Sequence, residues 1–305
     1  MDIVAFTDEH VDGAAGVLAE RHAAHLAVEP LLPHRTDFAA QVEKEREEGT
    51  GAVAVEAGEV VGYLLGNRRE DFLGPHIWSH VAGHAVRDPE LVRDLYAAAA
   101  SRWVEAGLTR HFVFVPAIRE LVEPWLRVTF GISAALAARE TSPDEEVGDG
   151  VAVRLSTPED TPVAAAFGRV LAQHLTEPPS FSFFTPPSEQ EYLDEWRNVH
   201  GEPEFTHFVA ERDGRVVGHV LMYRRPEGDL RVPPGNIDLA AAATLDDVRG
   251  TGVGLALTSH VLAWAHEEGF RSMTADWRSV NLLSSRFWPR RGFRPQFLRL
   301  YRAVP

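Results

Sequence analysis

The sequence predicts an α/β fold with a mixed sheet, repeated along the chain as two tandem domains. The same order of strand and helix patterns occurs in each half of the 305 residues. A charged stretch that contains Pro and Gly, "ARETSPDEEVGDGV", separates the halves and holds little that could enter a core. We therefore expect a first domain over residues 1–139, a linker over 140–150 and a second domain over 151–305.

Each half begins with a short strand and a helix, followed by a hairpin. The first segments are "IVAFTDEHVDGAAGVLAERHAAH" and "VAVRLSTPEDTPVAAAFGRVLAQH". The hairpins are predicted to turn at Ala57-Gly58 and at Asp213-Gly214, each between alternating runs of β-forming residues. A two-residue turn of this kind between such runs is typical of a β-hairpin.

A second strand and helix follow each hairpin. These segments are "HIWSHVAGHAV" with "LYAAAASRWVEAGL", and "NIDLAAAATL" with "GLALTSHVLAWAHEEGF". In the last of these helices Leu257, Val261 and Trp264 recur at helical spacing, so we expect that face to pack on the sheet. Each half then closes with a strand, a short helix and an aromatic-glycine pair, "FGI" or "RGF".

Composition limits the classes of function. No apolar run approaches the roughly 20 residues that cross a bilayer, and no signal peptide is visible, so we expect a cytoplasmic protein without a membrane partner. The absence of cysteine excludes disulfides, thiolate metal sites and a cysteine acyl-enzyme. A net charge of −15 argues against nucleic acid and fits a cationic small molecule. Monomer and homodimer both stay open.

The segment "VRGTGVG", from Val248 to Gly254, places three alternating glycines before a predicted helix. A dinucleotide fingerprint needs G-x-G-x-x-G after a first strand, and a Walker loop needs Gly followed by Lys and Ser or Thr; the segment has neither. Glycines let backbone N–H groups approach a ligand, and a helix N-terminus suits a pyrophosphate. A flexible loop without a ligand is the alternative.

This segment resembles the acyl-CoA pyrophosphate loop of the GNAT N-acetyltransferase superfamily, whose pattern is Arg/Gln-x-x-Gly-x-Gly/Ala. Arg249, Gly252 and Gly254 match that pattern. The later family signature, an Asn followed by an aromatic residue and a Gly-Phe pair, is present in "NLLSSRFWPRRGF". Its matching residues are Asn281, Trp288, Gly292 and Phe293. The C-terminal half resembles the family over its whole length, and the N-terminal half resembles it in element order only.

The resemblance implies acetyl-CoA as co-substrate and transfer to a primary amine of a small molecule in the C-terminal domain. With no cysteine we expect direct attack in a ternary complex, and we expect no metal. The resemblance also implies that the backbone N–H near Leu245 stabilises the oxyanion. Asn281 is expected to contact the CoA arm or to cap a helix. The residues expected to bind the cofactor are Thr244, Leu245, Arg249, Gly250, Thr251, Gly252, Val253, Gly254, Asn281 and Ser284.

For the general base, Asp238 is the candidate, because it shares strand parity with Thr244 and its place resembles that of a strand glutamate which is the base in some members. A solvated strand-end aspartate is the alternative. The general acid is often a Tyr, but Trp288 occupies that register, and an indole donates hydrogen bonds without being a usable acid. Tyr301, water or an unaided thiolate could replace it.

The N-terminal half lacks the loop. Aligning the glycines that end the long helices places "RDPELV", Arg87 to Val92, opposite it, with Asp88, Pro89 and Glu90 where phosphates would bind. We therefore expect a degenerate domain that shapes the structure or the substrate site. Histidines of "HIWSHVAGHAV" would share one strand face, but His76 and His80 would lie about 13 Å apart, too far to hold one metal ion.

Two alternatives to this function remain, and the role of one segment is open. A non-catalytic acyl-CoA binder or sensor would bind the cofactor without turnover. A mycothiol-synthase-like acetyltransferase would share the two-domain plan. The segment "TEPPSFSFFTPPSEQEYLDEW" either forms an apolar rim of the acceptor site, where Glu177, Glu189 and Glu191 attract a cation, or is a proline-rich surface loop.

Overall fold

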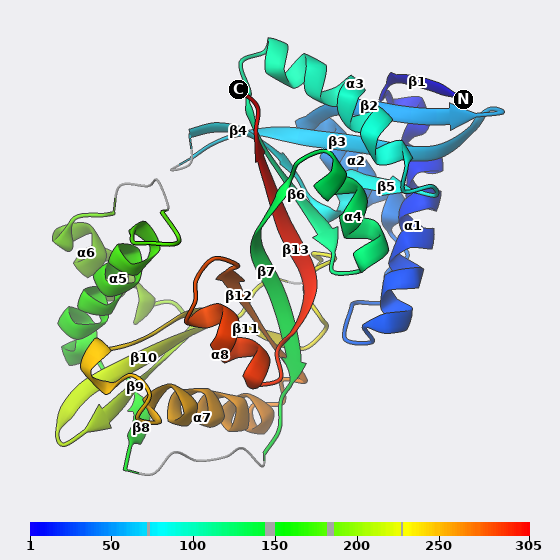
Figure 1. The fold of residues 1–305 in the computed structure, drawn as a ribbon. Coiled ribbons are helices and arrows are strands. Elements are labelled where there is room, and N and C mark those ends of the chain that lie inside the picture. Colours follow the sequence, from blue (N-terminus) through cyan, green and yellow to red (C-terminus); the bar gives the residue numbers. More distant parts are fainter. Residues whose placement is uncertain (72–73, 144–149, 182–185, 227) are drawn as a thin grey trace. The chain divides into compact units, whose positions relative to one another are not determined.

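The computed structural model describes residues 1–71, 74–143, 150–181, 186–226 and 228–305 (Figure 1). The chain divides into two compact units. The first comprises Met1–Leu136 and Pro295–Pro305, and the second comprises Ala137–Arg294. Both contain strands and helices, and the sheets are mixed, so the predicted α/β class with a mixed sheet is confirmed.

In the first unit a sheet runs in the order β1-β2-β3-β4-β6-β13, with β5 paired to β3 and the start of β7 beyond β13. Its strands are β1 (Asp2–Ala5), β2 (Gly49–Glu56), β3 (Glu59–Asp71), β4 (Gly74–Ser79), β5 (His84–Val86), β6 (Arg110–Pro116), β7 (Gly131–Glu140) and β13 (Arg294–Ala303). Its α-helices are α1 (Val11–Val28), α2 (Phe38–Glu48), α3 (Leu91–Glu105) and α4 (Arg119–Arg127). Buried residues of α3 and α4, including Tyr96, Trp103 and Trp125, form a core against the strands.

In the second unit the sheet order is β7-β12-β11-β10-β9-β8. The strands are β8 (Ala152–Leu155), β9 (Phe205–Arg212), β10 (Arg215–Tyr223), β11 (Asn236–Thr244) and β12 (Ser272–Arg278). The α-helices are α5 (Thr161–Thr176), α6 (Glu189–Val199), α7 (Val253–Glu267) and α8 (Ser284–Arg290). Leu221 of β10 packs into the α5–α6 cluster, whereas a Cβ on Gly218 would meet Leu257 of α7 at 3.0 Å. The helices α5 and α6 therefore lie on one face of β10, and α7 lies on the other.

The local predictions for hairpins and the long helix are confirmed. Ala57 and Gly58 have φ of 50° and 85°, and Asp213 and Gly214 have φ of 52° and 73°, which is the type I′ geometry of a two-residue hairpin turn. Leu257 and Val261 are buried. Trp264 is half-buried, with its ring 5.2 Å from that of Phe208.

The ends of the units differ from the predicted domain boundaries. Residues 295–305, expected in the second domain, belong to the first unit, because β13 pairs antiparallel with β6. The end of β7 belongs to the second unit, next to β12, and Thr141 donates its N–H to Arg271 O at 3.1 Å. A local sequence pattern predicts a strand but not the strand with which it pairs. The placement of β13 in the first unit and of the end of β7 in the second could therefore not be predicted from local patterns.

A β-bulge in β11 determines the geometry of the second unit. β11 pairs in parallel with β12 only from Asn236↔Ser272 to Leu239↔Ala275, and beyond that point the two strands separate. On its other edge, β11 pairs with β10 from Asp238 to Thr244, but the register shifts so that Ala240 has no opposite residue. The strands therefore diverge beside a bulge, just before the glycine loop.

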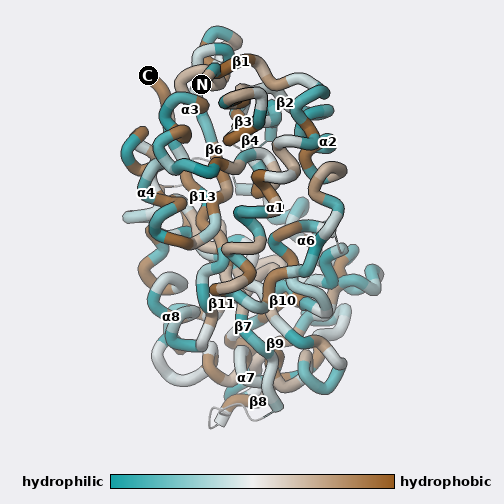
Figure 2. The backbone as a smooth tube through the Cα atoms, turned by 90° about the vertical axis from the view of Figure 1, so that its right-hand side faces the viewer, coloured by the Kyte–Doolittle hydropathy of each residue, from teal (hydrophilic) through white to brown (hydrophobic). Residues whose placement is uncertain are grey.

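The structure contains short apolar runs only. Figure 2 shows the hydrophobic colour in brief stretches along the tube. Within the described residues, no helix is long and apolar enough to span a membrane.

The entry to α5 is held by a buried carboxylate. Asp160 accepts hydrogen bonds from Arg154 Nη1 and Nη2 at 2.7 and 3.0 Å and from the Thr157 N–H at 2.8 Å. The hydrogen bonds from Arg154, only partly opposed by burial, lower the pKa of Asp160 to about 2. Because this folded-state pKa lies below the ordinary value of 3.8, the stabilisation is present above pH 4 and is lost as the pH falls through about 2.

We expect Asp160→Asn to lower the free energy of unfolding by about 2 kcal/mol at pH 7, with the deficit shrinking below pH 4. Chemical denaturation across pH measures this. Asp194→Asn is the control, since Asp194 pairs with Arg197 while both side chains are 58% exposed. Equal deficits for the two variants would contradict the assignment.

Candidate functional site

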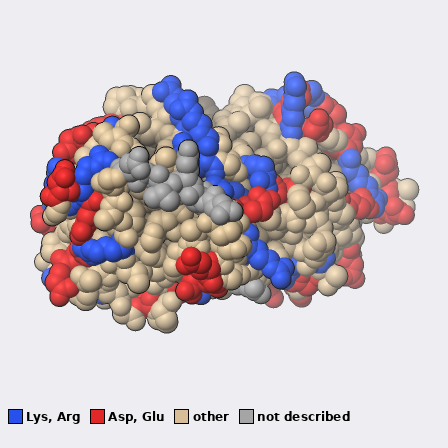
Figure 3. All heavy atoms as spheres, turned by 90° about the horizontal axis from the view of Figure 1, so that it is seen from below, with Lys and Arg blue, Asp and Glu red and all other residues tan. Residues whose placement is uncertain are grey.

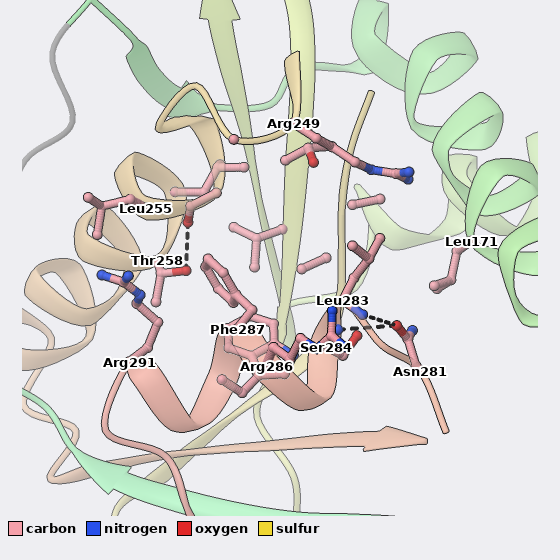
Figure 4. Close-up of a pocket in the computed structure, with 18 of the residues that line it drawn as sticks. Leu171, Arg249, Leu255, Thr258, Asn281, Leu283, Ser284, Arg286, Phe287 and Arg291 are labelled. Carbon is pink, nitrogen blue, oxygen red and sulfur yellow. Dashed lines mark hydrogen bonds between the residues drawn. The ribbon is translucent and has the colours of Figure 1, made fainter. Parts of the chain in front are cut away.

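The main cavity of the second unit lies where β11 leaves β12. Its volume is about 580 Å³. The wall combines the α5 side chains Leu171 and His174, the end of β11, the glycine loop, the start of α7, and α8 (Figure 4). The predicted residues that line it are Thr244, Arg249, Gly250, Gly252, Gly254, Asn281, Ser284 and Trp288. Thr251 and Val253 belong to the same loop but do not line the cavity, and neither do Asp238 and Leu245.

The glycine loop owes its shape to left-handed backbone. Gly250 and Gly252 have φ of 77° and 94°, and no described atom lies within 4 Å of a Cβ built on either. Gly252 is the N-cap of α7, so the unpaired N–H groups of the first helical turn follow it directly. Arg212 fixes the outer side of the loop by donating to Thr251 O at 2.9 Å. The loop therefore presents backbone donors at a helix N-terminus, as an anion site requires.

Arginines surround the cavity. Arg249 lines it and pairs with Asp246 at 2.6 Å, and Arg286, Arg290 and Arg291 line it from α8 and the residue that follows. Among the described residues, Arg286 and Arg290 pair with no carboxylate. The net charge is −15, and Figure 3 shows acidic and basic side chains interspersed on one face. The positive charge needed for a polyanion is thus supplied locally.

Asn281 caps the segment that enters α8. Its Oδ1 accepts the N–H groups of Leu283 and Ser284 at 3.0 and 3.1 Å, as Figure 4 shows. His174 Nε2 lies 3.2 Å from the same oxygen. Of the two predicted roles for Asn281, the structure shows the capping role. A contact with the CoA arm stays a prediction.

Asp238 and Thr244 do not share a face, contrary to the sequence prediction. Opposite Tyr223, Asp238 lies on the α5–α6 face, whereas Thr244, opposite Gly218, lies on the α7 face. The extra residue Ala240 reverses the alternation between them. Asp238 is 8% exposed.

Both carboxylate oxygens of Asp238 are engaged. Oδ2 pairs with Arg225 Nη2 at 2.5 Å, and Oδ1 accepts from Thr274 Oγ1 at 2.7 Å. Taking a proton from a substrate would therefore disturb an ion pair that is partly removed from water. The base assignment stays a prediction, and this arrangement weakens it.

Leu245 also requires correction. Its N–H donates to Val217 O at 3.0 Å, so it is not free to stabilise an oxyanion. In an antiparallel ladder, N–H groups point alternately to the two sides. Because Leu245 points to β10, the N–H groups of Thr244 and Ala242 point to the edge that β12 has left. These two amides replace Leu245 as the candidate donors.

The predicted acid position holds a buried indole. Trp288 is 8% exposed and packs edge-on against Phe287 and Phe293. Tyr301, the predicted substitute, lies on β13 in the first unit, with its ring 4.7 Å from that of Phe112. Two imidazoles that the sequence analysis did not single out line the cavity instead, His174 and His219. Only their shared place beside the cavity marks them, and no local pattern in the sequence predicts it.

The predicted rim segment uses its acidic residues locally. Glu189 pairs with Arg169 at 2.7 Å, and Glu191 accepts the Ser188 N–H at 2.7 Å in a capping box. Glu177 accepts from Gln173 Nε2 at 3.0 Å. Residues 182–185, which the rim prediction included, lie outside the described residues.

In the first unit the corresponding opening is closed. β4 pairs with β6 as far as Ser79↔Val113, and β5 pairs with β3. His84 Nε2 lies 2.7 Å from Phe114 O, and Arg21 donates to the carbonyls of His84 and Val81. The cavity left there measures about 10 Å³, which is less than a ligand needs.

The loop that replaces the glycines is also self-contained. Asp88 Oδ1 accepts the Glu90 N–H at 2.9 Å, so one of the donors that an anion would need is already used. The strand predicted over "HIWSHVAGHAV" is interrupted, since β4 ends at Ser79 and a 3₁₀ turn over Val81–Gly83 precedes β5. The histidines therefore do not alternate along one strand. Among the described residues no group of three or more His, Cys, Asp or Glu is arranged for a metal ion.

Comparison with known proteins finds a family match within the second unit. Residues 170–293 match the model of the acetyltransferase (GNAT) family. A GCN5-related N-acetyltransferase from Sphaerobacter thermophilus shares 15% identity at a TM-score of 0.60, over 99% of this chain and 95% of that one. A tandem GNAT protein from the clavulanic acid biosynthesis pathway shares 14% at 0.53, over 100% and 99%. At these identities the solved structures show a common fold, and no curated protein sequence matches the chain significantly.

We expect Gly252→Ala to weaken acetyl-CoA binding about tenfold, because Ala resists the φ of 94° and displaces the N–H groups of α7. Titration calorimetry measures the affinity. Gly214→Ala, at φ of 73° in the β9–β10 turn with no described atom within 4 Å of its Cβ, is the control. Both variants should lose about 1 kcal/mol of stability, since each forces Ala into left-handed backbone. An equal loss of affinity in both would contradict the role of the loop.

Proposed function

Since residues 170–293 form a domain of the GNAT acetyltransferase family, we propose that the chain transfers an acetyl group from acetyl-CoA to a primary amine of a small molecule, in its C-terminal unit. The observation that carries the proposal is the opening between β11 and β12, with free backbone donors on one side and the glycine loop at its end. Acetyl-CoA carries a thioester, then a pantetheine arm with amide groups, then a pyrophosphate. The amides would match the backbone donors, and the pyrophosphate would match the glycine loop.

The arm and the pyrophosphate would use different parts of the site. The amides of the arm pair with β11 as a further strand would, through Ala242 and Thr244, where β12 leaves that edge unpaired. The pyrophosphate lies over the N-terminus of α7, next to Arg249. Leu171 and Phe287 provide apolar wall between these polar groups.

The reaction is direct. The amine nitrogen attacks the thioester carbonyl, the C–N bond forms, the C–S bond breaks, and the electron pair leaves with the CoA thiolate. An alkylammonium, with a pKa near 10.4, must first lose a proton. The tetrahedral oxyanion would be stabilised by the amides of β11 that face the opening. With no cysteine in the chain, a cysteine acyl-enzyme has no nucleophile.

A non-catalytic acyl-CoA binder is the second candidate, favoured by the indole of Trp288 at the position of the usual acid. Thiol release distinguishes the binder from the enzyme. The binder would bind acetyl-CoA but would release no thiol with any amine.

Arg249→Ala tests the site against a matched control. We expect it to weaken acetyl-CoA binding about tenfold through loss of a charge-assisted contact. Arg215→Ala should stay within about twofold, a change of less than half a kcal/mol. Arg215 is likewise an exposed arginine paired with a loop aspartate, Asp247, at 2.7 Å, but it does not line the cavity.

Thiol release with a panel of primary amines then tests turnover. Binding in wild type with thiol release by at least one amine supports the enzyme. Binding without release by any amine favours the binder. No binding, or equal effects of the two arginine variants, would reject the proposed site.

A further inference from the structure

A chain of hydrogen-bonding side chains leads from the wall of the cavity toward the surface of the second unit. His219 Nδ1 lies 3.1 Å from His207 Nε2, and His207 Nδ1 lies 2.7 Å from Ser156 Oγ. His219 lines the cavity and is 1% exposed, whereas Ser156 is half-buried. The three side chains come from β10, β9 and the residue that follows β8.

The inner end of this chain is unsatisfied. His219 Nε2 is buried and has no hydrogen-bond partner among the residues that the structure describes. A buried polar atom without a partner is costly, and in a native protein it calls for an explanation. His219 lines the cavity, so its unpartnered nitrogen belongs to a ring of the cavity wall. Ala243, the residue opposite His219 on β11, also lines the cavity and has a small side chain.

Aromatic packing holds the His219 ring in place. Phe167 of α5 stacks on it at 4.8 Å, and Trp196 of α6 meets it edge-on at 5.3 Å. The titratable groups around the pair are His200, which faces His207, and Asp160, which acts on His207 through its charge. Burial lowers the pKa of His219 well below its ordinary value and that of His207 to about 4, so both rings are neutral near pH 7.

We propose that His219, His207 and Ser156 form a proton relay between the acyl-transfer cavity and solvent. This inference rests on the proposed function and deepens it. In the resting tautomer, Nδ1–H of His219 donates to His207, Nδ1–H of His207 donates to Ser156, and His219 Nε2 carries a lone pair toward the cavity. Two neutral rings in a row can pass a proton by exchanging tautomers, with no buried charge persisting.

In the direction from the cavity to solvent, the relay takes one proton from the substrate ammonium. It binds His219 Nε2 while Nδ1–H passes to His207 Nε2, Nδ1–H of His207 passes to Ser156 Oγ, and the Ser156 hydroxyl proton goes to water. In the opposite direction, the relay reverses each transfer and delivers the Nε2 proton to the CoA thiolate, which restores the resting tautomer. The second proton of the attacking nitrogen goes to water, so one proton is released per turnover.

The relay meets a need that the predicted base does not. Both oxygens of Asp238 already accept hydrogen bonds, from Arg225 and Thr274. His219 Nε2 accepts none. The relay also supplies an acid that can protonate the thiolate. The indole of Trp288 is not a usable acid.

Kinetics of His219→Gln and His219→Ala test the relay. We expect kcat to fall about 100-fold or more in both, with little change in KM for acetyl-CoA, because proton transfer is lost while cofactor binding is kept. Free imidazole should restore activity to the Ala variant by filling the vacated space. The pH profile of kcat should lose its acidic limb in the His219 variants and keep it in Asp238→Asn. His260→Gln is the control, a half-buried histidine on α7 whose ring contacts Phe208.

Unchanged kcat in both His219 variants, with wild type active, would overturn the relay and leave the proposed function standing. A fall in kcat with no rescue by imidazole and an unaltered pH profile would show a structural role and overturn it too. Nitrogen-15 imidazole spectra of wild type give a readout that needs no acceptor amine. A shift of the His219 Nε2 signal on adding acetyl-CoA supports the relay, and an unmoved signal despite calorimetric binding rejects it. No turnover with any amine would instead reject the proposed function, and the relay with it.

Discussion

The separation of β11 from β12 is the constraint on which the site depends. The two strands pair over only four positions, ending at Leu239↔Ala275, while β11 continues to pair with β10. The backbone groups on the free edge would be costly if they were buried without partners. A cavity lies there, and its wall also includes residues of α5, α7 and α8. The bulge at Ala240 adds a reversal of side-chain direction at the same point.

In the first unit, side chains of the chain itself fill the corresponding opening. Arg21, 7% exposed and without a carboxylate partner among the described residues, donates instead to the carbonyls of Val81 and His84. Burial lowers the pKa of its guanidinium to about 10. Burial lowers the pKa of His84 to about 3, so its ring is neutral. His84 Nε2 lies within hydrogen-bond distance of Phe114 O. Side chains thus satisfy backbone groups in the first unit, which explains why only about 10 Å³ is left there, against about 580 Å³ in the second unit.

Sequence patterns predicted the features of this molecule that neighbouring residues determine. The hairpin turns at Gly58 and Gly214 and the left-handed glycines at 250 and 252 follow from backbone sterics, which adjacent residues decide. The parity of Asp238 with Thr244 failed because a bulge depends on the pairing of two distant strands. The exchange of β13 into the first unit was missed for the same reason. The proposed role of His219 depends on contacts with residues distant in the sequence, namely Phe167, Trp196 and His207, so the sequence did not indicate it.

Charge in this protein acts on two length scales. At an ionic strength near 0.1 M the Debye length is about 10 Å, so the net charge of −15 affects approach from solvent more than contacts inside a cavity. Within the cavity, Arg249, Arg286 and Arg290 and the amides of α7 determine the field. A net negative charge with arginines gathered at one cavity is compatible with the approach of an ammonium and with a polyanion at that cavity. The two substrates of the proposed reaction have those opposite charges, and one chain can accommodate both only if its cations are gathered where the phosphates lie.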